Sequence, residues 1–355
     1  MTYLGVVLGF LLLIFVLWDT VETIILPRSV ARPLRLARLY YRNTWSVWSG
    51  IGRWISPGQQ RENFLSVFGP LSLLGLISVW AICLIVGFAM IQWGLEAKGI
   101  RPQALSEFGI ELYMSGVTFF TLGYGDVTPH TPLTRTVSVV EAGVGFGLLA
   151  VVISYLPVLY QTFSRREIRI LQLTIRAGSP PTAGELLRRY CQALNIEEMV
   201  LLLREWEIWS AELLESYQSY PVLAFYRSQQ ESQSWLVALT VILDTCALVN
   251  LGFQGDPAWQ KPLRWQAELT FTMARRAIVD LARSINVAPS PLTRNRLSKE
   301  QWACLCACLA SVGTPLSKGE TAEAKLSELR CQYEPYVNSL SKLLFVSLPP
   351  WFIPK

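Results

Sequence analysis

A short stretch of this chain has the residue types needed to hold a dehydrated cation with backbone oxygens. It begins at Thr121, ends at Asp126 and reads TLGYGD. Backbone carbonyls replace the water around an ion only when successive carbonyls point at one axis, which requires unusual backbone angles. Glycine reaches such angles without a steric penalty, so Gly123 and Gly125 predict a loop of converging carbonyls. The Thr121 hydroxyl would add an oxygen at the inner end.

The surroundings of this stretch decide between a coordinating loop and a chance GYG triplet in a surface turn. Long apolar segments flank it on both sides, an amphipathic segment precedes it, and the sequence VTP follows it from Val127. A bare triplet would favour the turn, whereas this combination favours the coordinating loop. The element expected to hold the loop is therefore a membrane hairpin.

In this setting the stretch resembles the selectivity-filter signature of the tetrameric potassium channel superfamily, in its bacterial type. The resemblance implies a filter made of Thr121, Leu122, Gly123, Tyr124 and Gly125. It implies K⁺ as the permeant ion, bound through the first four of these residues, and no other cofactor. The chain contains one such stretch, so a symmetric ring of carbonyls requires four copies and implies a homotetramer. The resemblance covers about residues 70–163.

The resemblance further implies a pore helix from Ser106 to Phe120 that supports the filter. Ser106 suits the N-cap and Glu107 the first turn of such a helix. Thr118 matches a threonine that is common three residues before the filter threonine. Asp126 is expected to brace the filter from behind or to shape its outer mouth.

The pore-helix region also departs from the family pattern. Two aromatic residues often stand midway along this helix, and here Tyr113 is followed by Met114. Val117 occupies the position of a glutamate that partners the filter aspartate in some members. Phe120 replaces a usual threonine, and Leu122 replaces the commoner valine. The expected filter supports are therefore Asp126, Thr118, Val117 and Tyr113, and a weakly selective cation channel remains an alternative.

Three apolar segments are long enough to cross a bilayer, which takes about 20 residues. They run from Tyr3 to Leu26, from Pro70 to Trp93 and from Leu133 to Tyr160. The first lacks the basic start and small-residue cleavage site of a secretory signal, so we interpret it as a retained helix. Trp93 suits the interfacial position that tryptophan favours.

The placement of the basic residues predicts the orientation of these spans. Seven arginines lie between the first two spans, and three follow the third span at Arg165, Arg166 and Arg169. Positively charged loops stay on the cytoplasmic side, so we expect the N-terminus outside and the C-terminus inside the cell. The basic and aromatic segment from Pro33 to Trp48 is either a helix lying on anionic membrane lipids or a loop that only fixes topology.

The third span would be the inner, pore-lining helix. It contains the closely spaced glycines Gly143, Gly145 and Gly147, which are candidates for a hinge or gate because glycine weakens a helix and permits close packing. Glu141 is an acid within the span. Such residues are costly in a membrane, so Glu141 has either a role in the ion pathway or gating, or a polar partner on a neighbouring helix.

The residues after the third span form a different, helix-rich region. We expect helices at Ala183–Leu194, Ile196–Tyr217, Gln266–Val287, Ser298–Ser311 and Thr321–Leu344. A glycine-rich GxGxxG loop is missing, so the nucleotide-binding regulator of many related channels is not expected, and any regulatory ligand stays unknown. The apolar segment from Trp235 to Phe253 is interpreted as a buried soluble helix rather than a fourth span, because Asp244 lies in its middle.

The whole sequence thus predicts an all-α membrane protein. Its composition is 52% hydrophobic and 16% charged, which is poor in charge for a soluble domain. The expected parts are an N-terminal transmembrane helix (1–27), a basic linker (28–64), a pore domain (65–163) and a helical cytosolic domain (164–355).

The composition also bears on the classes of function. The basic residues cluster beside membrane segments, which argues against nucleic-acid binding. The one histidine, His130, is expected outside the cell, so no nucleophile and base can be assembled inside it and enzymatic activity has no support. A membrane sensor that binds a partner through its helical domain and has a closed pore is a further alternative.

Overall fold

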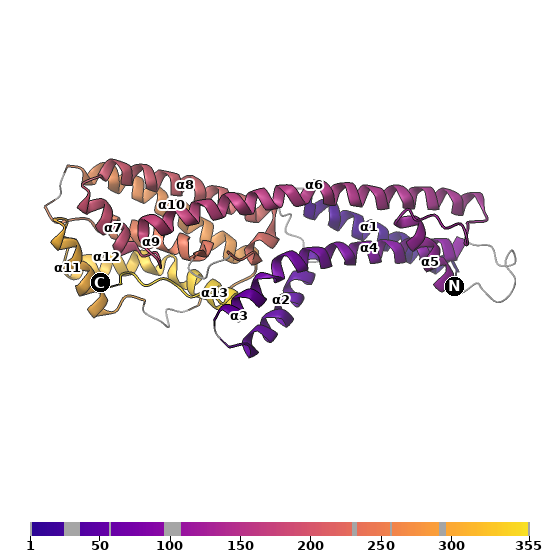
Figure 1. Cartoon of the computed structure of the whole chain (residues 1–355), viewed down its shortest axis with the longest axis horizontal. Helices are drawn as coiled ribbons and strands as arrows, with labels where there is room; N and C mark the ends of the chain where they lie inside the picture. The colour runs from indigo at the N-terminus through magenta and orange to yellow at the C-terminus, as the bar shows by residue number, and fades with distance from the viewer. Residues whose placement is uncertain are drawn as a thin grey trace. The chain divides into compact units, whose positions relative to one another are not determined.

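The computed structural model describes residues 2–24, 36–56, 58–95, 108–228, 233–255, 258–290 and 296–353. Every regular element among these residues is a helix, apart from one isolated bridge between Phe253 and Leu316 (Figure 1). This confirms the predicted all-α class. The expected pore-helix residues Ser106 and Glu107, and the arginines between 25 and 35, lie outside the described residues.

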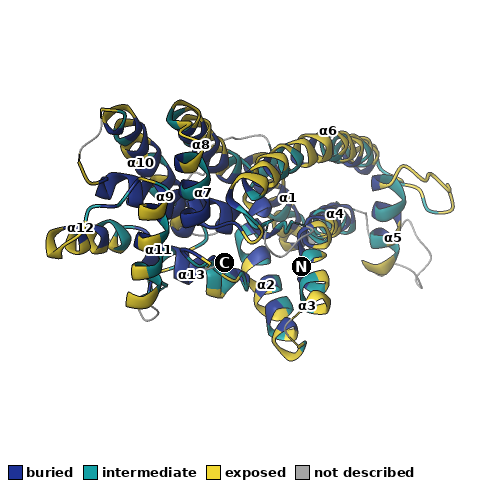
Figure 2. Cartoon of the chain, turned by 60° about the vertical axis from the view of Figure 1, so that its left-hand side comes forward, coloured by how far each residue is buried: buried dark blue, intermediate teal, exposed yellow. Residues whose placement is uncertain are grey.

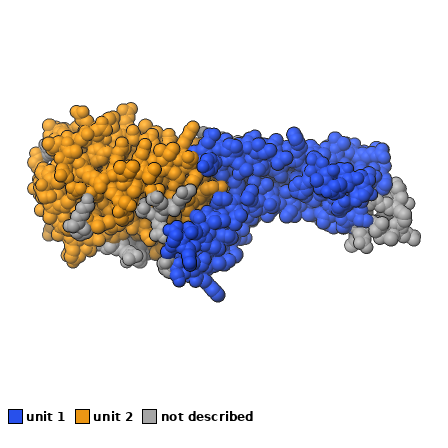
Figure 3. Space-filling model, viewed as in Figure 1, with its two compact units in different colours: residues 1–161 blue, residues 162–355 orange. Residues whose placement is uncertain are grey.

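The helices separate into two compact units, residues 1–161 and residues 162–355 (Figure 3). Helix α6 (Pro132–Ala177) contributes to both, because it runs unbroken through the division. The sequence analysis ended this helix near Tyr160. It continues because Ile170, Leu173 and Ala177 are buried in the second unit, so its polar end still has an apolar face.

The first unit is built around three helices that are long and apolar enough to cross a membrane. The corresponding ranges are Tyr3–Ile24, Gln59–Leu95 and Pro132–Ala177. Its helices are α1 (Thr2–Ile24), α2 (Leu36–Trp54), α3 (Gln59–Ser66), α4 (Phe68–Leu95), α5 (Phe108–Phe119) and the first part of α6.

Helices α1 and α4 pack closely through small residues. A Cβ atom added to Gly9 would lie 2.6 Å from the carbonyl oxygen of Gly87, and one added to Gly87 would lie 2.8 Å from the side chain of Leu13. Gly5 and Gly9 form the GxxxG spacing that lets membrane helices approach, a signal that the sequence analysis did not use. Helix α1 is thereby fixed against the outer helix of the hairpin.

A buried acid adds a polar tie between the same two helices. The indole nitrogen of Trp80 donates to Asp19 Oδ2 at 2.9 Å, and the backbone nitrogen of Leu36 donates to Asp19 Oδ1 at 3.1 Å. Asp19 is 3% exposed. These bonds give the buried carboxyl group of Asp19 polar partners inside the apolar unit, which a buried polar group requires.

Helix α2 is amphipathic and lies against α3 and α4. Its buried face presents Tyr41 and Trp45, and the ring of Trp45 meets that of Phe68 edge-on at 4.9 Å. Its other face exposes Val47, Ile51 and Trp54. A helix over 36–54 extends beyond the expected segment, which ended at residue 48.

The second unit surrounds one wholly buried helix with amphipathic ones. All residues of α9 (Trp235–Leu251) are buried, as the dark blue ribbon in Figure 2 shows. The helices around it are α7 (Ala183–Gln192), α8 (Ile196–Ser219), η1 (Pro221–Phe225), α10 (Gln260–Ser284), α11 (Lys299–Ser311), α12 (Glu320–Cys331) and α13 (Glu334–Leu344). This arrangement agrees with the interpretation of 235–253 as a buried soluble helix.

Asp244, in the middle of α9, is held by a buried ion pair. Arg296 donates from Nη2 to Asp244 Oδ1 at 2.7 Å and from Nη1 to Oδ2 at 2.9 Å, while Tyr333 donates to Oδ1 at 2.5 Å. Arg296 also bonds Glu334 at 2.9 Å. Burial alone would lower the pKa of Arg296, but the two carboxylates raise it above its usual value, so the guanidinium stays charged.

The prediction of a helical segment at Thr321–Leu344 is confirmed except that the segment forms two helices rather than one. The helix α12 ends at Cys331 and α13 begins at Glu334. Pro335 lies in the first turn of α13, and proline has no N–H for the hydrogen bond that a continuous helix would need. The chain therefore breaks before it.

Candidate functional site

The short helix α5 ends in a backbone motif that starts the TLGYGD loop. The nitrogen of Thr121 donates to the carbonyl of Thr118 at 3.0 Å, and the nitrogen of Leu122 donates to the carbonyl of Val117 at 2.9 Å. This pair of bonds is the Schellman motif, whose left-handed residue is usually glycine. Here that residue is Thr121, with φ of 56°.

A β-branched residue in the left-handed region is rare and costs about 1–3 kcal/mol. Such strain persists where the surrounding structure holds it, and it gathers at functional sites. The position of Thr121 is thus specified by two carbonyls of α5, those of Val117 and Thr118. Both of these contacts with the loop are made by the backbones of Val117 and Thr118 and not by their side chains.

The loop after Thr121 alternates between two backbone conformations. Thr121, Gly123 and Gly125 have φ of 56°, 63° and 78°, whereas Leu122 and Tyr124 are not among the residues of positive φ. Positive φ at every second residue is a conformation that L residues rarely adopt, and glycine supplies it at two of these three positions. The arrangement suits a row of carbonyl oxygens around a cation.

The end of the loop is tied back to α5 by side chains. The hydroxyl of Tyr113 donates to Asp126 Oδ2 at 2.9 Å. Tyr113 lies about two turns before the Schellman motif, so the loop is held at both ends by one helix. The predicted brace at Asp126 therefore has a partner in Tyr113.

The side chains of the loop are exposed in the single chain. Phe120, Leu122 and Tyr124 are 59%, 53% and 67% exposed. Three large apolar side chains within five residues are thus open to contact with another surface.

Helix α6 passes behind α5 and touches it through one of the three candidate glycines. A Cβ atom on Gly145 would lie 2.1 Å from the carbonyl oxygen of Phe119, the last residue of α5. Gly143 and Gly147 have open space where a Cβ would be. Gly145 is thus a site of close packing, and α6 stays helical through it.

Glu141 lies one turn before Gly145 and joins three helices. Gln92 Nε2 of α4 donates to Glu141 Oε2 at 2.6 Å, and the Ser115 hydroxyl of α5 contacts Oε1. The same hydroxyl lies 2.8 Å from the carbonyl oxygen of Ile85. Glu141 is fully buried, so the structure gives it the polar partners that the sequence left open.

Two features of this region were not predicted from the sequence. Gln92 and Ser115 were visible only as polar residues within apolar helices, which is a weak signal for a partner of Glu141. Pro157 lies inside α6, where it removes a backbone hydrogen bond and permits a bend. A proline within an apolar span is visible in the sequence, so this bend could have been predicted.

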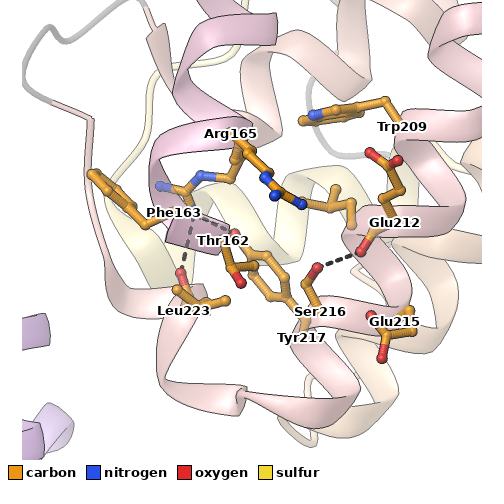
Figure 4. Close-up of a pocket in the computed structure, with 11 residues that line it drawn as sticks. Thr162, Phe163, Arg165, Trp209, Glu212, Glu215, Ser216, Tyr217 and Leu223 are labelled. Atoms are coloured by element: carbon orange, nitrogen blue, oxygen red, sulfur yellow. Dashed lines mark hydrogen bonds between the residues drawn. The ribbon is translucent and has the colours of Figure 1, made fainter. Parts of the chain in front are cut away.

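The second unit has a pocket of about 230 Å³ where α6 meets α8. Its lining residues include Phe163, Arg165, Trp209, Glu212 and Tyr217 (Figure 4). The lining mixes basic, acidic and aromatic side chains. The view shows these side chains converging from α6, α8 and the following turn.

Arg166 forms the inner wall of this pocket and is 6% exposed. Its Nη1 donates to Tyr217 Oη at 2.6 Å and to the Leu223 carbonyl at 3.2 Å, and Nη2 donates to the Tyr226 carbonyl at 2.9 Å. Burial raises the pKa of Tyr217 to about 12, so its hydroxyl stays neutral as an acceptor. Arg166 thus fastens the end of α6 to α8 and the turn after it.

Comparisons with known proteins place the hairpin in a family. A family model described as "Ion channel" matches residues 75–161. Protein LctB of Bacillus caldotenax is 33% identical over 94 residues, which cover 24% of this chain and 69% of that protein. Protein LctB of Geobacillus stearothermophilus is 34% identical over 96 residues, or 23% of this chain and 71% of that protein.

A longer but weaker similarity extends beyond the hairpin. The uncharacterized membrane protein YdjJ of Bacillus subtilis (strain 168) is 24% identical over 193 residues. The match covers 53% of this chain and only 55% of that protein. No solved structure matches the chain significantly. The three long apolar helices make this a multi-pass membrane protein. Because the family model matches its hairpin and the LctB proteins are similar to it, the chain belongs to the ion channel family.

Proposed function

We propose that this protein is a potassium-selective channel that conducts K⁺ down its electrochemical gradient. The observation that carries the proposal is the alternating backbone from Thr121 to Gly125 at the end of α5. Carbonyls that converge on one axis replace the hydration shell of an ion, and several adjacent sites let ions leave as readily as they enter. Leu122 and Tyr124 contribute their carbonyls, so the identity of their side chains is secondary.

The proposed channel is a homotetramer. One chain supplies one loop, and a ring around an ion needs four. The exposed side chains of Phe120, Leu122 and Tyr124 are then covered by neighbouring copies. The N-terminus is proposed to lie outside the cell and the second unit in the cytoplasm. The arginines lie between the first two spans and after the third, and loops rich in arginine stay on the cytoplasmic side.

The second unit is proposed to regulate the pore. Helix α6 carries Glu141 and Gly145 in the first unit and Arg166 in the second, without an intervening loop. A movement of the buried Arg166 is therefore passed to the inner helix along one helix, in which Pro157 removes a single backbone hydrogen bond between the two regions. The proposal includes no enzymatic activity.

The test is a comparison of K⁺ and Na⁺ flux into liposomes that contain the purified full-length protein. The variant Gly123→Ala places a Cβ at φ of 63°, which costs about 1–2 kcal/mol in the left-handed region. We expect K⁺-selective flux in the unaltered protein and lost selectivity in this variant.

The matched control is Gly50→Ala in helix α2, where a Cβ would meet nothing within 4 Å and the backbone is helical. This variant should retain selective flux. Equal Na⁺ and K⁺ flux in the unaltered protein would reject potassium selectivity and favour a weakly selective cation channel.

A further inference from the structure

The hydrogen bonds around Glu141 can be counted. The Ser115 oxygen is within bonding distance of two acceptor groups, the carbonyl of Ile85 and the carboxyl of Glu141. A serine hydroxyl carries one hydrogen and can donate to only one of them. Both contacts are satisfied if Ser115 donates to Ile85 and Glu141 itself donates to Ser115. That arrangement requires a proton on Glu141 Oε1.

The electrostatic surroundings require the same proton. Helices α4 and α5, which hold the partners of Glu141, contain no lysine or arginine. Their titratable side chains are Cys83, Glu111 and Tyr113, and none of these supplies a positive charge. A fully buried carboxylate that receives no positive charge from the helices contacting it is costly, and a carboxyl group in that position takes up a proton instead.

The contacts of Glu141 also determine how the helix before the filter is held. Glu141 and Gly145 are one turn apart on α6, and their contacts Ser115 and Phe119 are one turn apart on α5. Two contacts with matched spacing fix both the position and the rotation of α5. The carbonyls that hold Thr121 and Leu122 lie between these contacts, at Val117 and Thr118.

We propose that Glu141 is a protonated positioning residue, which ties the pore helix to both membrane helices of the hairpin and so sets the geometry of the filter. Its proton bridges Glu141 Oε1 to the Ser115 hydroxyl, which bonds Ile85, while Gln92 bonds the other oxygen. The link to the filter rests on the proposed channel function, whereas the protonation of Glu141 is independent of that function.

The protonation is tested by infrared spectroscopy of the full-length protein in lipid at neutral pH. We expect a carbonyl stretching band of a protonated carboxylic acid that disappears in Glu141→Gln. The matched control is Glu111→Gln, which removes another buried acid of the same region and should retain that band. If no band of a protonated acid disappears specifically in Glu141→Gln, the proposal is overturned.

The positioning role is tested by K⁺ flux in liposomes. Glutamine donates from its amide to Ser115 and accepts from Gln92, so Glu141→Gln should retain K⁺-selective flux. Glu141→Leu leaves the Ser115 and Gln92 groups without this partner and should lower the selective flux roughly tenfold. Equal impairment of both variants would show that a carboxylate is required and would overturn the proposal. If the unaltered protein shows no flux, the channel function fails, while the infrared band still reports the proton.

Discussion

At the scale of single residues, the bond between Tyr113 and Asp126 makes a testable contribution to the proposed filter. Tyr113→Phe removes the donor of a 2.9 Å bond and leaves the ring in place. A net contribution of about 0.5–1.5 kcal/mol corresponds to a several-fold change, so we expect the ratio of K⁺ to Na⁺ flux to fall several-fold.

The matched variant for this bond is Asp126→Asn. Its amide oxygen still accepts from Tyr113, so the flux ratio should stay near that of the unaltered protein. A fall in Asp126→Asn without one in Tyr113→Phe would assign the effect to the negative charge at the mouth rather than to the bond.

The sequence made some residues of this site predictable and hid others. Glycine spacing indicated the unusual backbone of 121–125 because conformational freedom is a local property of glycine. The partners of Glu141 lie 49 and 26 positions away in the sequence, at Gln92 and Ser115. No local pattern specifies such a distant pairing, so the sequence could mark Glu141 as unusual without naming its contacts.

At the scale of elements, the fastening of α6 by Arg166 is the contact on which the proposed regulation by the second unit depends. Arg166→Met keeps much of the side-chain length but loses the bonds to Tyr217, Leu223 and Tyr226. We expect K⁺ flux that differs several-fold from that of the unaltered protein, because bonds to a charged group contribute about 1.5–3 kcal/mol each.

The control for Arg166 is its neighbour on the same helix. Arg165 lines the mouth of the pocket and is exposed, so Arg165→Met should leave the flux unchanged (Figure 4). Identical flux from both variants would contradict coupling through Arg166.

Element boundaries were less predictable than the elements themselves. Apolar length specified the membrane helices, because a span needs a minimum of apolar residues. The continuation of α6 to Ala177 depends on its burial against the second unit, which is tertiary information. The break before α13 was visible in Pro335, although the apolar pattern on both sides suggested one helix.

At the scale of the whole molecule, the folded second unit depends on the ion pair inside it. Asp244→Asn leaves Arg296 buried without one of its two carboxylates. Loss of one partner of a buried pair costs about 3–5 kcal/mol. We expect a clearly lower urea midpoint for the full-length protein in detergent, read by tryptophan fluorescence.

The comparison for this stability test is Asp280→Asn. Asp280 forms ion pairs with Arg276 and Arg283, both of which are about 70% exposed. Exposed pairs contribute about 0–1 kcal/mol, so the midpoint should barely move. Equal shifts in the two variants would contradict a special role for the buried pair.

The buried ion pair also has a consequence for the synthesis of the chain. Helix α9 leaves the ribosome before α10, α12 and α13, so for a time it is an apolar segment without the helices that later cover it. The insertion machinery then meets a further apolar segment after the three helices that are long and apolar enough to span. An aspartate at the centre of an inserting helix costs about 2.5–3.5 kcal/mol. Asp244 therefore makes insertion of α9 into the membrane unfavourable before Arg296 is available as its partner.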